Sequence, residues 1–453
     1  MKRLLSTDFV KDKNLNQSLN FVILGICFGV VFLNVTVGTP IAGLAKELKF
    51  GDLLYGIMLA MPVLGGTVQI FASFILEKTK KRKKLFLLSG FINRILWIFV
   101  AILPLLISNR TLLFYLIVAV LIFSSIGGAF LNVTFMSWMG DLVPLDIRGR
   151  FFSHRSMLST IVSFISGLAI GKFLDTIPGI LGFSIIFGIA TLFGLLDIAC
   201  YLKVHDPPMK NDIEIQESFL NISKKVLSHP AFSKYLIFAV VWSFSLNIAA
   251  PYFNLYMIKY LRMSYFEIAL YAQLVSNLAT VVFVRIWGRM IDRFGNKPVA
   301  LICTTTVSFL PILWCFTTPQ SWLFLVILIQ FLAGLFWPGV DLSYNNFALR
   351  LSPDENRSMY IAVLNLFVGV IGNAIAYIFG GYIIENISPL ISSFLENTVH
   401  FHLADYHYLF IFSAILRFVS SRIFLPKIKE EGAYSINELK GILIRRRGSR
   451  LIP

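Results

Sequence analysis

The sequence contains little charge for its length. Asp, Glu, Lys and Arg make up only 14% of the 453 residues, whereas hydrophobic residues make up 57% and mean hydropathy is +0.76. Soluble domains carry roughly 25% charged residues. The chain therefore has too little polar surface to coat a water-soluble globule of this size, and we expect an all-α membrane protein.

Familiar catalytic and redox motifs are also missing. No P-loop, HExxH, GxSxG or CxxC arrangement occurs, so ATP-driven pumping and membrane hydrolysis lack support. We expect neither an enzyme nor a bound cofactor. The four cysteines all lie in apolar runs without histidine partners and are expected to be buried thiols: Cys27, Cys200, Cys303 and Cys315.

The basic excess and the histidines point to no nucleic acid and no metal. The net charge is +16, but the cations form short clusters between apolar runs and build no basic, aromatic-interleaved face. One group of possible metal ligands precedes the last apolar stretch: His400, His402, Asp405 and His407. Metal-ligand spacing is conceivable there, but a solvated loop is the simpler interpretation.

Twelve apolar stretches of about 20 residues predict twelve transmembrane helices. They cover residues 20–44, 53–76, 85–107, 112–138, 155–175, 180–202, 235–258, 266–287, 299–317, 322–348, 359–384 and 406–425. The predicted domains are an N-terminal segment, a six-helix bundle, a linker, a second six-helix bundle and a basic tail: 1–19, 20–202, 203–234, 235–425 and 426–453. The first stretch is longer than a signal-peptide core and lacks a small-residue cleavage pattern, so we expect it to remain in the mature protein.

Lysine and arginine are distributed unequally between the two sides of the membrane. One side receives the basic segments 2–13, 78–84, 148–155, 203–234, 285–297, 350–357 and the tail. The other side receives only Lys46, Lys49, Arg110, Lys172, Lys259 and Arg262. The positive-inside rule then predicts that both termini are cytoplasmic, in a protein of the plasma (inner) membrane.

The two halves of the chain repeat one another at a separation of roughly 210 residues. LVPLDIRGRFF from Leu142 aligns with LSPDENRSMY from Leu351, and Arg148 then falls on Arg357. Further upstream, Asn34 aligns with Asn247. Two equivalent membrane halves predict a pseudo-symmetric pair of bundles that rock against one another around a site between them.

The loop after the eighth stretch resembles the cytoplasmic loop motif of the major facilitator superfamily. GRMIDRFGNKP, residues 288–298, matches that motif at Gly288, Asp292, Arg293, Gly295 and Lys297. The corresponding loop of the first half is degenerate, with Glu77 in the place of the aspartate. Span number, loop charges and both repeats extend the resemblance over essentially the whole chain, and it implies the major facilitator fold.

These loop charges also predict a cytoplasmic gate. By symmetry, Asp292 is expected to face the loop that holds Arg357, and Glu77 the loop that holds Arg148 and Arg150. A carboxylate there can pair with an arginine and favour the positive end of the following helix. What the resemblance implies is a latch that involves Glu77, Arg148, Arg150, Gly288, Asp292, Arg293 and Arg357. The alternative is that these charges only set topology.

Polar residues within the apolar stretches are the candidates for solute binding, since burying them in lipid is costly. The resemblance implies that spans one, four, seven and ten line the central cavity, which places Asn34 opposite Asn247 and Asn132 opposite Asp341. The alternative for each asparagine is a hydrogen bond between helices. Further candidate lining residues are Tyr252, Asn254, Gln273, Asn277 and Asn365.

Three charged residues within the spans have distinct interpretations. Asp341 follows Trp337-Pro338-Gly339, where the helix can bend, so it could carry a proton or pair with a cationic solute, or act as a surface latch. Arg94 could bind an anionic group, but snorkelling or pairing with another helix is the simpler interpretation. Asp197 is a weaker candidate, because it lies close to cytoplasmic water.

Two cytoplasmic segments predict helices outside the spans. In the linker, Phe219, Ile222 and Val226 form the apolar face of a short interfacial helix that breaks at His229-Pro230. In the tail, Ser435 and Glu438 form a capping-box pattern before a basic, membrane-surface helix. A partner-binding or disordered tail is the alternative.

The sequence therefore predicts a secondary transporter that works by alternating access. Its solute would be a small polar organic molecule, co-moving protons are one energy source, and a monomer in the lipid bilayer is expected. The alternative is a membrane sensor or scaffold that keeps the fold but moves nothing. A cavity filled by side chains would favour this alternative.

Overall fold

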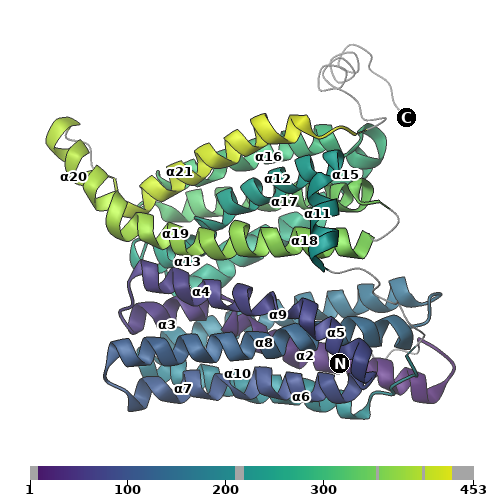
Figure 1. Cartoon of the computed structure of the whole chain (residues 1–453). Helices are drawn as coiled ribbons and strands as arrows, with labels where there is room; N and C mark the ends of the chain where they lie inside the picture. The colour runs from purple at the N-terminus through teal and green to yellow at the C-terminus, as the bar shows by residue number, and fades with distance from the viewer. Residues whose placement is uncertain (1–8, 210–218, 354–356, 400–402, 431–453) are drawn as a thin grey trace, which may run out of the picture. The chain divides into compact units, whose positions relative to one another are not determined.

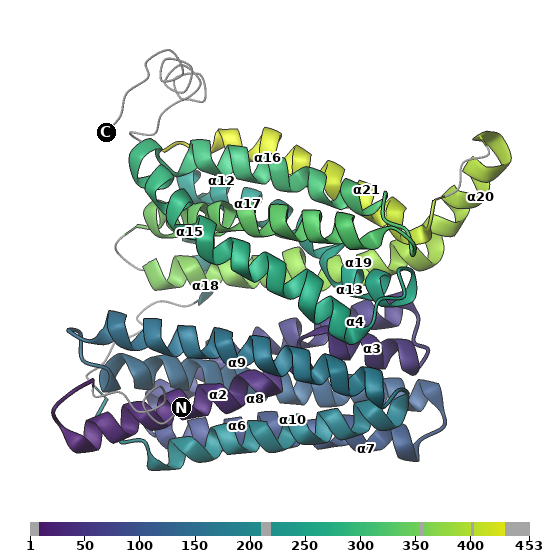
Figure 2. The same ribbon diagram turned by 180° about the vertical axis from the view of Figure 1, so that it is seen from behind.

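The computed structural model describes residues 9–209, 219–353, 357–399 and 403–430, and within them it is helical, without strands. Twelve helical stretches of this part are long and apolar enough to cross a membrane, and each overlaps one of the twelve predicted stretches. Figures 1 and 2 show the helices from two opposite sides. Large apolar side chains such as Phe71, Phe324 and Phe394 are about two-thirds exposed or more, as expected of surfaces that face lipid.

The chain divides into two compact units. Unit 1 comprises Met1–Glu214 and Phe253–Ala269, and unit 2 comprises Ile215–Tyr252 and Leu270–Pro453. The helices of the first half are α2 (Lys13–Thr36), α3 (Thr39–Glu47), α4 (Asp52–Gly66), α5 (Gln69–Thr79), α6 (Arg82–Ile95), α7 (Trp97–Leu106), α8 (Arg110–Leu142), α9 (Arg148–Thr176), α10 (Ile180–Cys200) and η1 (Tyr201–Lys203). The domain limits given above stay predictions.

The second half has the same order of spans with more local irregularity. Its elements are α11 (Phe219–Ser228), α12 (Pro230–Asn247), α13 (Ala250–Lys259), α14 (Tyr265–Glu267), η2 (Ile268–Leu274), α15 (Val275–Phe294), α16 (Asn296–Trp314), α17 (Trp322–Leu351), α18 (Arg357–Phe367), η3 (Val368–Ile375), α19 (Ala376–Tyr382), η4 (Ile383–Ile387), α20 (Ser388–Val399), α21 (Asp405–Val419), η5 (Ser420–Phe424) and η6 (Leu425–Lys427). The segments η2 to η5 are π-helical, a form that often marks functional segments.

The first span of each half is broken at a similar place. The first span is interrupted between α2 and α3, and the seventh between α12 and α13. Pro40 and Pro251 are each the second residue after the break. Proline lacks the amide hydrogen that a continuing helix needs, yet fits the first turn of a new one. The repeat in the sequence therefore has a counterpart in local structure.

Aromatic side chains and glycines build the core of unit 1. The rings of Trp97 and Phe187 stack with centroids 5.7 Å apart, and Trp138 meets the ring of Phe86 edge-on at 5.5 Å. α8 approaches α6 closely at Gly127, where an added Cβ would lie 2.9 Å from the backbone oxygen of Ser89. Small residues at such crossings let membrane helices pack tightly.

The linker helix α11 packs against the rest of unit 2 through Val226, the one residue of its predicted apolar face whose side chain is described. Val226 is fully buried and belongs to the core of unit 2, whereas Lys224 and Lys225 are exposed. The predicted break is confirmed: His229 caps α12 by accepting a hydrogen bond at Nδ1 from the Phe232 amide, and Pro230 is the first helical residue. The predicted tail helix with Ser435 and Glu438 lies outside the described residues.

Candidate functional site

A cavity of about 460 Å³ lies within unit 1, a volume typical of small-molecule sites. α2, α6 and α8 supply most of its wall, and α4, α7, α9, α10 and η1 also contribute to it. Its lining includes Gly29, Phe32, Asn93, Arg94, Trp97, Ser124, Asn132, Phe135, Arg155, Asp197 and Tyr201. The wall thus combines aromatic rings, amides, a hydroxyl and three charged groups.

A buried ion pair forms one side of this cavity. Arg94 of α6 donates from Nη2 to Oδ2 of Asp197 on α10 at 2.9 Å, and both side chains are only 8% exposed. The Arg94 guanidinium also lies over the Phe32 ring, 4.1 Å from its centroid, a cation–π contact. Arg94 is therefore paired with another helix, as one of its two simpler interpretations predicted.

Glycines make room for the pair. A Cβ at Gly29 would lie 2.7 Å from Oδ2 of Asp197, and a Cβ at Gly194 would lie 2.8 Å from Cδ of Arg94. Neither contact is tolerable without a shift of the charged group. The pair is therefore built into the packing of α2, α6 and α10. It does not sit in spare space.

A second arginine lines the cavity without a carboxylate partner. Arg155 of α9 is partly exposed, and its guanidinium lies 5.0 Å from the centroid of the Phe135 ring. Among the described residues, no salt bridge involves Arg155. In the same part of the chain, the buried Nε atoms of both Arg94 and Arg155 have no hydrogen-bond partner.

Ser124 joins three helices of the cavity wall. Its Oγ accepts from Trp97 Nε1 at 2.9 Å and donates to the backbone oxygen of Asn93 at 2.9 Å, while Asn93 Nδ2 donates to the Ser124 carbonyl at 2.6 Å. These bonds lock α6, α7 and α8 together. Asn132, two turns further along α8, is exposed in the cavity, and no hydrogen bond of its side chain occurs within the described part of the chain.

The aligned asparagines of spans one and seven make equivalent bonds in the two units. Asn34 Nδ2 donates to the Ser163 carbonyl and the Ser166 hydroxyl of α9, at 2.7 and 2.8 Å. Asn247 Nδ2 donates to Oδ1 of Asn373 in η3 at 2.8 Å. The helix–helix alternative therefore describes both residues. They join span one to span five and span seven to span eleven.

The other predicted residues are dispersed. Asn254 is partly buried in α13, in the part that belongs to unit 1. Tyr252 is fully buried and donates to the Tyr377 carbonyl at 2.5 Å. Four residues are exposed on separate elements of unit 2: Gln273 on η2, Asn277 on α15, Asp341 on α17 and Asn365 on α18. Their roles in solute binding stay predictions.

Pro338, before Asp341, leaves a backbone carbonyl of α17 without its helical hydrogen bond, and side chains of the neighbouring helix α15 lie within hydrogen-bond distance there. Pro338 has no amide hydrogen, so the Gly334 carbonyl one turn back loses its helical donor. Thr280 Oγ1 of α15 lies 3.5 Å from that oxygen, and Trp287 Nε1 donates to the next carbonyl, Leu335, at 2.6 Å. α17 therefore stays one helix through Trp322–Leu351.

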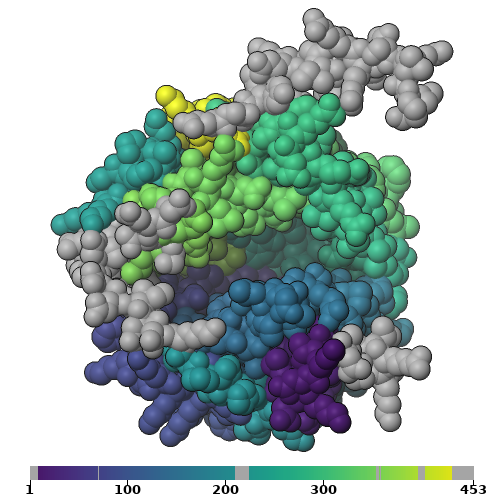
Figure 3. All heavy atoms as spheres, turned by 90° about the vertical axis from the view of Figure 1, so that its right-hand side faces the viewer, coloured from purple at the N-terminus to yellow at the C-terminus, as the bar shows by residue number. Residues whose placement is uncertain are grey.

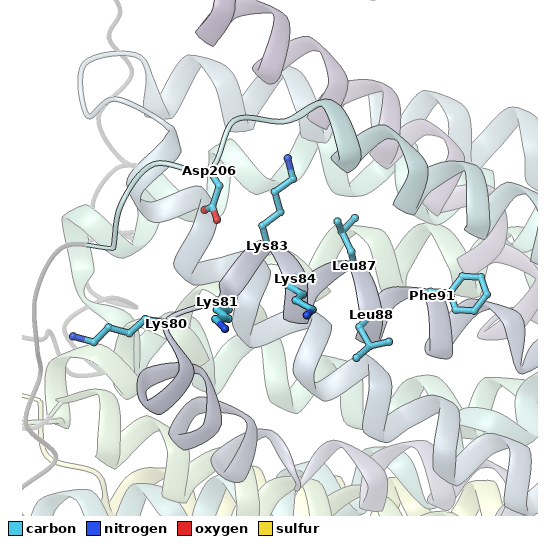
Figure 4. Close-up of a pocket in the computed structure, with 8 residues that line it drawn as sticks. All are labelled: Lys80, Lys81, Lys83, Lys84, Leu87, Leu88, Phe91 and Asp206. Carbon is cyan, nitrogen blue, oxygen red and sulfur yellow. The ribbon is translucent and has the colours of Figure 1, made fainter.

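Two charged clusters at the ends of the spans occupy equivalent places in the two halves. In unit 1, Arg82 at the start of α6 is buried and pairs with Asp141 at the end of α8 and with Asp206 after η1. Figure 4 shows Asp206 beside the lysines that begin α6. Nearby, Lys83 Nζ donates to the carbonyls of Leu202 and Val204, at 3.0 and 2.7 Å.

The cluster in unit 2 repeats this plan around Glu430. Its carboxylate accepts from the backbone amides of Asn296 and Lys297 at the start of α16 and pairs with Arg350 at the end of α17. Lys297 Nζ donates to the carbonyls of Pro426 and Ile428, both at 2.8 Å. Sequence reasoning missed both clusters, although Asp141 and Arg350 directly precede the aligned Leu142 and Leu351.

Two of the predicted gate residues, Arg148 and Arg150, bind backbone carbonyls. Arg148 donates to the carbonyls of Gly140 and Val143 at the end of α8. Arg150 donates to the Phe9 carbonyl at 2.7 Å, next to the first turns of α2, which are purple in Figure 3. Asp292, Arg293 and Arg357 are exposed, and Gly288 and Glu77 are partly exposed. Their gating role stays a prediction.

Two buried groups of unit 2 correct or extend the sequence analysis. His407 is only 3% exposed and lies in the first turn of α21, so it is not part of a solvated loop; His400 and His402 lie outside the described residues. Within the described part, no group of three or more His, Cys, Asp or Glu could hold a metal. Arg417 of α21, which sequence reasoning missed, is buried and donates to Ser413 Oγ at 3.1 Å and to carbonyls at the end of α12.

The sequence comparisons identify the family. The sequence model of the Major Facilitator Superfamily matches residues 21–285 and 272–441. The chain belongs to this superfamily. It is therefore an integral, multi-pass membrane protein of a family of transporters, and the family points away from an enzyme. A curated protein from Arabidopsis thaliana, "Probable peptide/nitrate transporter", is 27% identical over 177 residues, which cover 36% of this chain and 35% of that protein.

Solved transporter structures share this superfamily member's fold. The nucleoside transporter NupG has a TM-score of 0.64 at 14% identity, covering 92% of this chain and 100% of that one. A bacterial homologue of the human lysosomal transporter Spinster has a TM-score of 0.63 at 16% identity, covering 93% and 100%. A POT family transporter in complex with 5-aminolevulinic acid has a TM-score of 0.61 at 17% identity, covering 92% and 96%.

Proposed function

We propose that this member of the superfamily is a secondary transporter that moves a small organic solute by alternating access, with the unit 1 cavity as part of its binding site. The observation that carries the proposal is the Arg94–Asp197 pair at the cavity wall. Charged groups within a spanning segment are costly, and they persist where a cavity or a partner gives them a role. Here both conditions hold.

The cavity also argues against the alternative of a sensor or scaffold that moves nothing. A protein that only kept the fold would have no need of open volume next to buried charge, whereas about 460 Å³ remains between these side chains. We further propose that both termini are cytoplasmic, that the membrane is the plasma membrane and that the protein acts as a monomer. The loop charges described above support this orientation.

Transport is tested in vesicles that contain the purified protein. Thermal-shift screening against nucleosides, short peptides, nitrate, 5-aminolevulinic acid and other small metabolites would select a ligand, and preloaded vesicles should then show counterflow of that ligand. The first four are the solutes named for the similar transporters described above. Binding without counterflow would favour the sensor.

Proton coupling through Asp341 is a separate part of the proposal. In Asp341→Asn vesicles we expect loss of accumulation driven by a pH gradient, while solute exchange continues, because the amide cannot release a proton. Gln320→Glu, which adds an exposed acid before α17 in the same unit, should leave exchange intact and is the control for surface charge. Unchanged accumulation in Asp341→Asn would remove this role.

A further inference from the structure

We infer that the solute is an organic monocarboxylate and that Arg155 is the residue that binds its charge; this inference rests on the proposed function of the unit 1 cavity. The charged residues of the cavity lining favour an anionic ligand. Arg94, Arg155 and Asp197 are its charged residues. Since Arg94 and Asp197 neutralise each other at 2.9 Å, one positive charge remains for a ligand.

The remaining positive charge, that of Arg155, is held in position and can still bind an anion. The Arg155 guanidinium rests against the Phe135 ring, which holds it in position without neutralising it. Its Nε and that of Arg94 are buried without a hydrogen-bond partner in the described chain. A buried donor left unpaired is costly, and a bound carboxylate would satisfy it. A guanidinium and a carboxylate also match in shape, because two parallel hydrogen bonds can form.

The remaining lining residues fit the uncharged part of such an acid. Phe32, Trp97 and Phe135 offer apolar surface, and Asn132 offers an amide with free donors and acceptors beside them. A cationic solute would meet an uncompensated arginine here. A dianion would exceed the single free charge, so a monocarboxylate with an apolar or aromatic body fits best.

The binding experiment compares acids with their uncharged amides on the purified full-length chain. The probes are phenylacetate, benzoate and hexanoate, each paired with its amide, with ligand-induced thermal shifts and dissociation constants as readouts. We expect at least one acid to bind and its amide to bind far more weakly. Arg155→Gln should weaken binding of that acid by ~30-fold or more, as is typical when one partner of a desolvated charge pair is removed. Arg155→Lys should have an intermediate effect.

Two further variants keep the test decisive. Arg110→Gln removes an exposed arginine at the start of α8, outside the cavity, and should leave the affinity unchanged. If Arg155→Gln fails to fold, Asn132→Asp replaces it: this nearly isosteric change adds a negative charge to the cavity and should weaken acid binding but not amide binding.

The outcomes separate this inference from the proposed function. Equal binding of acid and amide, or full affinity in Arg155→Gln or Asn132→Asp, would overturn the inference. Binding of the acid that depends on Arg155 but produces no counterflow in vesicles would sustain the inference and overturn transport. Counterflow of a neutral or cationic solute that does not depend on Arg155 would do the reverse.

Discussion

At the scale of single residues, charge buried inside unit 1 depends on individual partners. Arg94 and Asp197 are 103 positions apart in the sequence. Among the described residues, neither forms a salt bridge with any other group. Removing one partner of such a pair strands the other in a medium that solvates it poorly. Replacing both by apolar groups avoids that cost but also removes the chemistry.

Asp197→Asn is expected to destabilise unit 1 by about 3–5 kcal/mol, because Arg94 would lose its counter-charge while staying buried. Thermal unfolding in detergent measures the loss, with the exposed Asp341→Asn as a matched control that should change little. The double variant Arg94→Met/Asp197→Leu should recover much of the stability. If Asp197→Asn is as stable as the parent protein, the pair is not a buried structural element.

The aligned asparagines give a second prediction at this scale. Asn34→Ala and Asn247→Ala each remove a hydrogen bond between helices, and in membrane proteins such bonds contribute about 0.6–1.7 kcal/mol. We expect similar losses in the two variants, since each asparagine joins the first span of its half to the fifth. Asn365→Ala, at an exposed position, should be nearly neutral in the same unfolding measurement; a loss as large as that of the other two would contradict this account.

At the scale of elements, the two charged clusters show one arrangement with the charges exchanged. The residue at the start of span three is Arg82 and its counterpart at span nine is Asn296, whereas Asp141 at the end of span four corresponds to Arg350. In unit 2, Glu430 joins both helix ends, because it binds the first amides of α16 and pairs with Arg350 of α17. In unit 1, Arg82 joins them, because it pairs with Asp141 of α8 and with Asp206 after η1. The residue that joins the two helix ends is therefore an arginine in unit 1 and an acid in unit 2.

This exchange can be copied from one half into the other. Arg82→Asn alone leaves Asp141 and Asp206 without their shared cation and should cost about 3–5 kcal/mol. Adding Asp141→Arg reproduces the arrangement of unit 2 and should restore most of the stability. Thermal unfolding checks both variants.

The control for this exchange is Lys84→Asn, which removes an exposed cation two residues further along α6 and should have little effect. A double variant that is less stable than Arg82→Asn would show that the two clusters are not interchangeable.

At the scale of the whole molecule, the division into units does not follow the repeat completely. Residues 253–269 belong to the second half by sequence but are grouped with unit 1. Asp52 pairs with Lys259 at 3.0 Å, and the Asp175 carboxylate accepts from the amides of Tyr265 and Phe266 at 2.9 and 3.0 Å. Polar contacts of this kind are individually weak.

Asp175→Asn should loosen this segment, because an amide oxygen is a weaker acceptor than a carboxylate for two backbone donors. We expect faster hydrogen exchange in residues 253–269, with the remainder of unit 1 unchanged. Asp146→Asn, an exposed aspartate before α9, is the control. Exchange that stays at the parent rate in 253–269 would mean that other contacts hold the segment.

Features that depend on neighbouring residues could be predicted from the sequence alone. Hydropathy over about 20 residues places a membrane span, so the twelve spans were predictable. Proline and histidine chemistry placed the break before α12, and matched motifs revealed the duplication. The same local information gave the superfamily, since its loop motif is contiguous from Gly288 to Lys297.

Which polar groups contact one another became known only from the folded chain. Asp206 lies 124 positions from Arg82, and nothing local to either residue reveals the other. The same holds for Arg155, which has no salt bridge among the described residues. It also holds for Asn34, whose partner from the sequence could be either a solute or another helix. Pairing over such separations depends on how helices pack, because packing sets which carboxylate reaches which cation. Hydropathy along the sequence does not reveal which helices pack together.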